Sequence, residues 1–82
     1  MMQYQRVPTK RFRRDLRRLK KSGYDLQKLG RVINDLASGK VLDPKFRDHA
    51  LKGKLQETRE CHIGPDWLLH YSKDRNCLIL FM

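Results

Sequence analysis

The sequence has no long hydrophobic run. No stretch approaches the ~20 consecutive apolar residues that a helix needs to cross a bilayer. The N-terminal segment Met1–Arg6 lacks the apolar core of a signal peptide. Because the mean hydropathy is -0.77 and 34% of the residues are charged, we expect a soluble cytoplasmic protein. Its 82 residues leave room for one domain, residues 1–82, with one modest core.

Cysteine is also scarce, with only Cys61 and Cys77 present. The two do not form a CxxC unit, and two thiols with three histidines scattered along the sequence make a poor zinc-ligand set. In a cytosolic chain we expect both cysteines to remain reduced, as half-buried strand residues. The spacing therefore predicts neither a disulfide framework nor a metal site.

Acidic residues are few, with 9 Asp and Glu against 19 Lys and Arg, and the formal net charge is +10. The excess is uneven: residues 1–31 hold eleven basic residues against two acidic ones, a balance of +9. Such a polarised field attracts a polyanion, which could be nucleic acid, an anionic membrane surface or an acidic protein. A solvated helix face is the plainer alternative, but the density of charge along one short segment favours a binding surface.

The first part of the chain predicts a strand followed by a helix. Residues 3–7 form a short strand, which Pro8 closes. Thr9 is a good N-cap for a helix that ends at Gly23 in a left-handed cap. The apolar residues of this helix share one stripe: Phe12, Leu16 and Leu19. The basic residues between them lie on the faces left to solvent or ligand.

A second helix follows, with Asp25 as its N-cap and Gly39 beyond its end. Its apolar stripe recurs at helical spacing and consists of Leu26, Leu29, Val32, Ile33, Leu36 and Ala37. Since only Gly23-Tyr24 separates the two helices, we expect an antiparallel helical hairpin that faces a common core.

The last part of the chain predicts a β-meander. Residues 40–54 have no period and are predicted to be a loop. From Gln56 the pattern has period two, and turns at 64–66 and 72–76 divide it into three strands. The strand 67–71 is apolar on both faces and is therefore expected in the centre. The fold class is α+β, in the order β-α-α-β-β-β, with an antiparallel sheet packed against a helical hairpin.

Three motifs carry a resemblance to a known family. They are Arg47-Asp48-His49-Ala50-Leu51-Lys52-Gly53, Arg59-Glu60-Cys61-His62 and Pro65-Asp66-Trp67, the last followed by the apolar strand that ends at Tyr71. In this order they resemble the YafQ branch of the RelE-type toxins of bacterial type II toxin–antitoxin systems. The order of the expected elements also matches, so the resemblance covers essentially the whole chain and implies a RelE-like fold.

The resemblance implies a messenger-RNA endoribonuclease that acts in the ribosomal A site and is bound by a cognate antitoxin in a hetero-oligomer. The family works without metal or another cofactor, through attack of the ribose 2′-OH on the adjacent phosphate. Its active-site residues carry over to His49, His62, Asp66 and Trp67.

The residue types suit this chemistry, which needs a base for the 2′-OH, a cation for the phosphorane charge and an acid for the 5′-oxygen. Histidine can serve in either proton role, so His49 and His62 are the first candidates. Asp66 could act as a base, orient a histidine or merely cap its turn. Trp67 could stack on a base or belong to the core. His70, in an apolar strand, is expected to be packed or to face a partner.

Arginines are the candidate RNA contacts. Arg59 could clamp a phosphate, although strict alternation places it on the opposite strand face from His62. The first helix contributes four more candidates, all off the apolar stripe: Arg13, Arg14, Arg17 and Arg18. We expect them to contact RNA phosphates.

One motif departs from the family pattern. Family members continue into a tail resembling R-x-G-(T/S)-H-x-x-L-F, whose histidine is the usual candidate for the general acid, whereas this sequence stops at Phe81-Met82. We therefore expect slow cleavage by the 82-residue chain. The alternative is a non-catalytic truncated toxin that binds its antitoxin and RNA without cutting. A DNA-binding role for the arginine-rich helix is weaker, because no helix-turn-helix signal is present.

Overall fold

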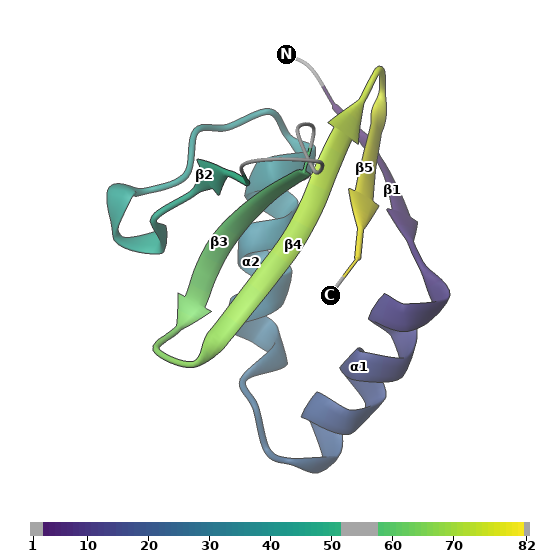
Figure 1. The fold of residues 1–82 in the computed structure, drawn as a ribbon, viewed down its shortest axis with the longest axis vertical. Helices are drawn as coiled ribbons and strands as arrows, with labels where there is room; N and C mark the ends of the chain where they lie inside the picture. The colour runs from purple at the N-terminus through teal and green to yellow at the C-terminus, as the bar shows by residue number, and fades with distance from the viewer. Residues whose placement is uncertain (1–2, 52–57, 82) are drawn as a thin grey trace.

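A computed structural model describes residues 3–51 and 58–81. The elements follow the chain in this order: β1 (Gln5–Pro8), α1 (Lys10–Lys21), α2 (Leu26–Ala37), a 3-10 turn η1 (Pro44–Phe46), β2 (His49–Ala50), β3 (Thr58–Gly64), β4 (Trp67–Asp74) and β5 (Cys77–Leu80). Figure 1 shows α2 passing behind β3 and β4, while α1 lies beside the sheet. The predicted α+β class is confirmed.

The strands form one sheet in the order β1-β5-β4-β3-β2. β3, β4 and β5 are antiparallel neighbours, so the predicted meander is confirmed, and β4 is the central strand as expected. The prediction of a wholly antiparallel sheet was wrong, because β1 pairs with β5 in parallel. The four residues of β1 carry no pattern that reveals which strand they pair with or in which direction.

The loop predicted for residues 40–54 was also partly wrong. It contains η1, which begins at Pro44 after the Asp43 cap, and the two-residue strand β2. β2 pairs with β3 through His49 opposite Glu60 and Ala50 opposite Arg59. Two residues are too few to show a period, so only the pairing with β3 defines this strand. Residues 52–57 lie outside the described residues; they include the end of the predicted loop and, at 56–57, the start of the first predicted strand of the meander.

The helix ends follow the capping chemistry of the sequence. The Thr9 hydroxyl accepts a hydrogen bond from the Phe12 amide at 3.2 Å, and the Asp25 carboxylate caps α2 in the same way. Gly23 has φ +79°, which is the left-handed conformation predicted for the residue after α1. Neither helix has the length and hydropathy needed to span a membrane within the described residues.

The core lies between α2 and one face of the sheet. It is formed by the buried residues Phe12, Leu29, Val32, Ile33, Leu36, Ala37, Leu42, Cys61, Ile63, Leu69, Tyr71, Leu78 and Leu80. Leu16 and Leu26 pack against this core from the two helices, so the predicted stripes do share it. Since side chains alternate along a strand, the residues between these positions face the other way. We call this second side, which carries Glu60, His62 and His70, the open face.

The two cysteines lie on strands that are not neighbours, Cys61 on β3 and Cys77 on β5, as the predicted strand order requires. Both are free thiols, with Cys61 fully buried and Cys77 half-buried. Burial raises the pKa of the Cys61 thiol to about 12, and the nearby carboxylates of Asp48 and Glu60 add to the shift.

A thiol-labelling experiment tests this arrangement. At pH 8, a maleimide should modify one cysteine per native chain, because the reagent needs an accessible thiolate and Cys61 offers neither the thiolate nor access. Mass spectrometry should place the label on Cys77, and a second label should appear only in denaturant. Labelling of Cys61 in the native protein, or a bridge between Cys61 and Cys77, would contradict the packing of β3.

Candidate active site

The two predicted catalytic histidines lie near each other on the open face. His49 is carried by β2 and His62 by β3, and their ring centroids are 6.2 Å apart with the planes tilted by 31°. The two strands are adjacent, and His49 lies opposite Glu60, two residues before His62. Thirteen residues of sequence therefore separate two rings that the sheet brings to one place.

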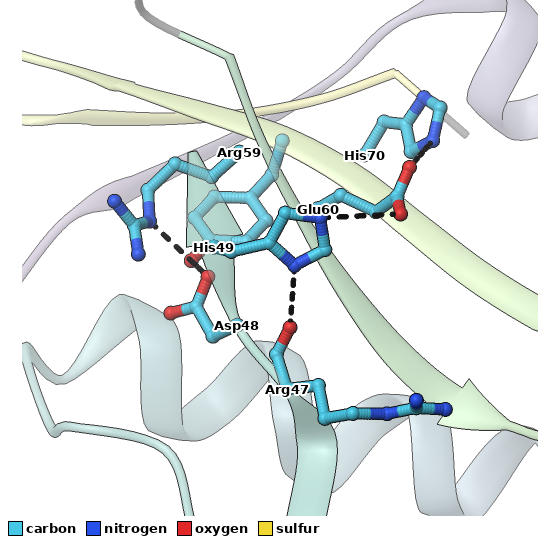
Figure 2. Close-up of polar contacts among 7 residues, drawn as sticks. Arg47, Asp48, His49, Arg59, Glu60 and His70 are labelled. Carbon is cyan, nitrogen blue, oxygen red and sulfur yellow. Dashed lines mark hydrogen bonds and ion pairs between the residues drawn. The ribbon is translucent and has the colours of Figure 1, made fainter. Parts of the chain in front are cut away.

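A carboxylate lies between histidines on this face. Glu60 Oε2 is 2.8 Å from His70 Nε2, and Glu60 Oε1 is 3.5 Å from His49 Nε2. Figure 2 shows the Glu60 carboxylate between the two rings, with dashed lines to both. Positive charge on either ring is balanced by this carboxylate. The sequence assigned His70 a packed or partner-facing role, and the structure gives it Glu60 as a partner.

The backbone fixes the tautomer of His49. Its Nδ1 lies 2.7 Å from the Arg47 carbonyl oxygen, which only accepts hydrogen bonds, so Nδ1 carries a proton. Nε2 is then the atom that gains or loses a proton, and it faces Glu60 and the open side of the sheet. His62 differs, because its Nδ1 is buried with no hydrogen-bond partner within residues 3–51 and 58–81. Buried polar atoms without a partner are rare, and a catalytic role is one of the reasons for which they are retained.

Beneath His49, a polar cluster ties its strand to the sheet. Asp48 Oδ1 accepts hydrogen bonds from the Arg59 Nε at 3.1 Å and from the buried Tyr71 hydroxyl at 2.7 Å. Burial, and then the hydrogen bond to Asp48, raise the pKa of Tyr71 above its ordinary value. Arg59 is paired with Asp48 in this cluster (Figure 2), on the strand face opposite to His62 as alternation predicted.

Within residues 3–51 and 58–81, no hydrogen bond or ion pair joins Asp66 to His49 or His62. Asp66 is exposed in the turn between β3 and β4, and it lines a cleft together with Trp67, Tyr24, Arg18 and His70. The Trp67 and Tyr24 rings meet edge to face with centroids 5.0 Å apart. His70 belongs both to this cleft and to the Glu60 pair, so it connects the two halves of the site.

Four of the five predicted arginine contacts lie on α1. Arg13, Arg14 and Arg17 are exposed, and Arg18 lines the cleft of Asp66 while it pairs with Asp15 at 3.1 Å. The basic face of α1 therefore reaches the site through Arg18.

The site can also offer ligands to a metal ion. One donor atom each from His49, Glu60 and His62 lies within 4.8 Å of the other two. Imidazole and carboxylate ligands suit zinc and copper ions. The histidines that are scattered along the sequence are thus partly gathered by the fold, and the sequence alone could not show this.

The pairing of Glu60 with His70 was not predicted from the sequence. The alternation of side chains along β3 and β4 predicts that Glu60 and His70 both lie on the open face. Their contact also requires the register that sets Glu60 opposite His70. The register of two strands is not visible from either strand alone.

Comparisons with known proteins give one consistent relationship. A family model described as bacterial toxin of type II toxin–antitoxin system, YafQ, matches residues 4–82. The mRNA interferase toxin YafQ of Escherichia coli K12 is 30% identical over 61 residues, which span 73% of this chain and 66% of that protein.

Solved structures agree with this relationship. A copper-bound mutant toxin from Helicobacter pylori is 43% identical, with a TM-score of 0.91 over 94% of this chain and 88% of that chain. YafQ in the E. coli DinJ–YafQ toxin–antitoxin complex is 25% identical, with a TM-score of 0.88 over 96% of this chain and 88% of that chain.

Proposed function

Because the chain belongs to the YafQ family of toxins of bacterial type II toxin–antitoxin systems, we propose that it is a messenger-RNA endoribonuclease controlled by a cognate antitoxin. The observation that carries this proposal is the His49–His62 pair on the open face. The name of the E. coli relative, an mRNA interferase toxin, supports the substrate, and the DinJ–YafQ complex supports the antitoxin. The proposed target is message in the ribosomal A site, which places the reaction in the cytoplasm.

The proposed reaction is attack by a ribose 2′-oxygen on the adjacent phosphorus. A bond forms between these two atoms, and the bond from phosphorus to the 5′-oxygen of the next nucleotide breaks. The 2′-OH proton passes to a base, and an acid supplies a proton to the 5′-oxygen. The products are a 2′,3′-cyclic phosphate and a 5′-OH, so the reaction needs no oxidant or further reactant.

Two histidines at this separation suit the two proton transfers. We assign the base to His62, whose ring has no hydrogen bond within the described residues. His49 carries the proton that stabilises the phosphorane or protonates the leaving oxygen, because the Glu60 carboxylate faces its Nε2. Asp66 and Trp67, in the neighbouring cleft, are assigned to the nucleotide beside the cleaved bond, where an indole can stack on a base.

The decisive experiment is cleavage of message on programmed ribosomes, with the product ends identified by mass spectrometry. The proposal expects cuts that appear only when ribosomes are present and that leave 2′,3′-cyclic phosphate ends. Binding of an antitoxin or RNA without any cleavage would instead identify a non-catalytic binding module.

Metal ions provide a separate test. We expect cleavage to be unaffected by a chelator selective for transition metals, because none of the proposed steps uses such an ion. Micromolar Zn²⁺ should slow cleavage roughly tenfold or more, since His49, Glu60 and His62 would be occupied as ligands. Cleavage that requires added metal would contradict the proposed mechanism.

The basic face of α1 should contribute to RNA affinity. Replacing Arg13, Arg14, Arg17 and Arg18 by Gln should make binding to single-stranded RNA less dependent on salt, by about 0.7 in the logarithmic slope per lost phosphate contact. Fluorescence anisotropy over a salt series measures this slope. The unfolding temperature should hardly change, because three of the four side chains are exposed without partners in the described structure and Arg18 has only the Asp15 pair. An unchanged slope would exclude α1 as an RNA contact.

A further inference from the structure

A second pocket adjoins the histidine pair on its other side. It lies where the start of α2, the turn η1 and the end of β3 meet, and it is lined by Lys28, Lys45, Arg47, His62, Gly64 and Pro65. We call it the Arg47 pocket. Three of its lining residues are cations and none is acidic. From the sequence, Lys28 counted only toward the basic excess of residues 1–31, and no individual role was predicted for Lys45 or Arg47.

Arg47 lines this pocket and has an uncommon backbone conformation. Arg47 follows η1 and adopts a left-handed conformation, with φ 48° and ψ 47°. This conformation costs free energy for a residue with a Cβ, and such residues gather at functional sites. The Arg47 carbonyl accepts the His49 hydrogen bond, while Figure 2 shows its side chain extending away from His49 and Asp48. One residue therefore orients the catalytic ring and supplies a cation to the neighbouring pocket.

The cations of the pocket are not neutralised by the protein. Within residues 3–51 and 58–81, no carboxylate lies within ion-pair distance of Lys28, Lys45 or Arg47. The Lys45 ammonium lies 5.2 Å from the centre of the Phe46 ring, which leaves its charge unbalanced. Three like charges around one hollow repel each other, and a bound anion relieves that repulsion.

We propose that the Arg47 pocket is a subsite for the RNA phosphate next to the one that is cleaved. This inference rests on the proposed function, because it takes RNA as the ligand of the open face. His62 belongs both to the pocket and to the His49–His62 pair, so an RNA strand that places one phosphate at the pair brings a neighbouring phosphate to the pocket. A guanidinium flanked by two ammonium groups matches the oxygens of a phosphodiester.

The experiment pairs a change in the protein with a change in the RNA. The ligands are short single-stranded RNAs that are 2′-O-methylated throughout, so that they cannot be cut, and each carries one neutral methylphosphonate at a different position. Wild type, Arg47→Gln and the control Lys40→Gln are compared by anisotropy. Lys40 lies beyond the far end of α2 from Lys28, and its loss changes the net charge by the same amount.

We expect one methylphosphonate position to weaken wild-type and Lys40→Gln binding roughly tenfold, as the loss of one charge-assisted contact. Arg47→Gln should bind this RNA as tightly as it binds the parent RNA, which carries a phosphate at every position. Lys28→Gln and Lys45→Gln should reduce the effect at the same position, and the three variants should keep the circular-dichroism spectrum of the wild type.

The inference would be overturned if, at every methylphosphonate position, wild type and Arg47→Gln lost the same amount of RNA affinity. It would also be overturned if the three variants lost affinity for the antitoxin and none for RNA, which would identify a pocket for an acidic side chain of the partner. Failure of the wild type to cleave message would refute the proposed nuclease function, whereas position-specific coupling to Arg47 in these uncleavable RNAs would still support the subsite.

Discussion

We expect His62→Gln to lower the rate of message cleavage by roughly 100- to 10,000-fold, the range for loss of one general acid–base group. Glutamine retains much of the size and polarity of histidine but cannot exchange a proton near neutral pH. His62 lies on the open face and not in the core, so the variant should fold and bind its antitoxin as the wild type does. Single-turnover cleavage on programmed ribosomes measures the loss.

His70→Gln is the matched control for this prediction. It changes the same residue type on the same face, but His70 reaches the pair only through Glu60, so we expect a loss of less than about tenfold. Together the two variants separate a proton-transfer role from a general effect of altering the open face. A larger loss in His70→Gln than in His62→Gln would show that the catalytic group has been assigned to the wrong ring.

Asp48→Ala should have the second largest effect, on both stability and cleavage. It removes the acceptor of the buried Tyr71 hydroxyl and the partner of Arg59. Leaving a buried donor unsatisfied costs about 1–3 kcal/mol. We therefore expect an unfolding temperature lower by about 10 °C, as a domain of this size shifts by about 4–8 °C per kcal/mol.

Cleavage by Asp48→Ala should fall roughly 100-fold, because Asp48 fixes the strand that presents His49 and a small misplacement of a reacting group can cost that much. Tyr71→Phe is the control: it removes the donor, keeps the Asp48–Arg59 pair and should lose only about 1 kcal/mol. Scanning calorimetry and single-turnover cleavage measure the two effects. If the two variants were equally stable and equally active, Asp48 would not be what positions His49.

The elements of this fold could be predicted where local chemistry determines them. Thr9 and Asp25 cap their helices because their side chains bond to amides two or three residues away. The turn after β3 follows from Gly64-Pro65-Asp66, and the central place of β4 follows from its apolar faces. In each case, the interaction that decides the structure lies within a few residues of the chain.

The candidate site could be predicted only in part. The motif resemblance named His49 and His62, and the structure places them together. The resemblance could not show that Asp66 lines a cleft with Arg18, Tyr24 and His70. The Glu60–His70 pair and the Asp48–Arg59–Tyr71 cluster join residues ten to twenty-three positions apart. Their contacts depend on strand register and on the two-residue strand β2, and neither leaves a period in the sequence.

The parallel pairing of β1 with β5 has a consequence for how the protein is made. β1 can pair with β5 only after residues 77–80 have been synthesised. β1 and the two helices are therefore made before the strand with which β1 pairs. Contacts between such distant residues slow folding, since the intervening chain must be ordered first. During synthesis, the pairing of β1 with β5 therefore forms after the other described elements have been made. Until residues 77–80 have been made, Gln5–Pro8 have no neighbouring strand with which to pair.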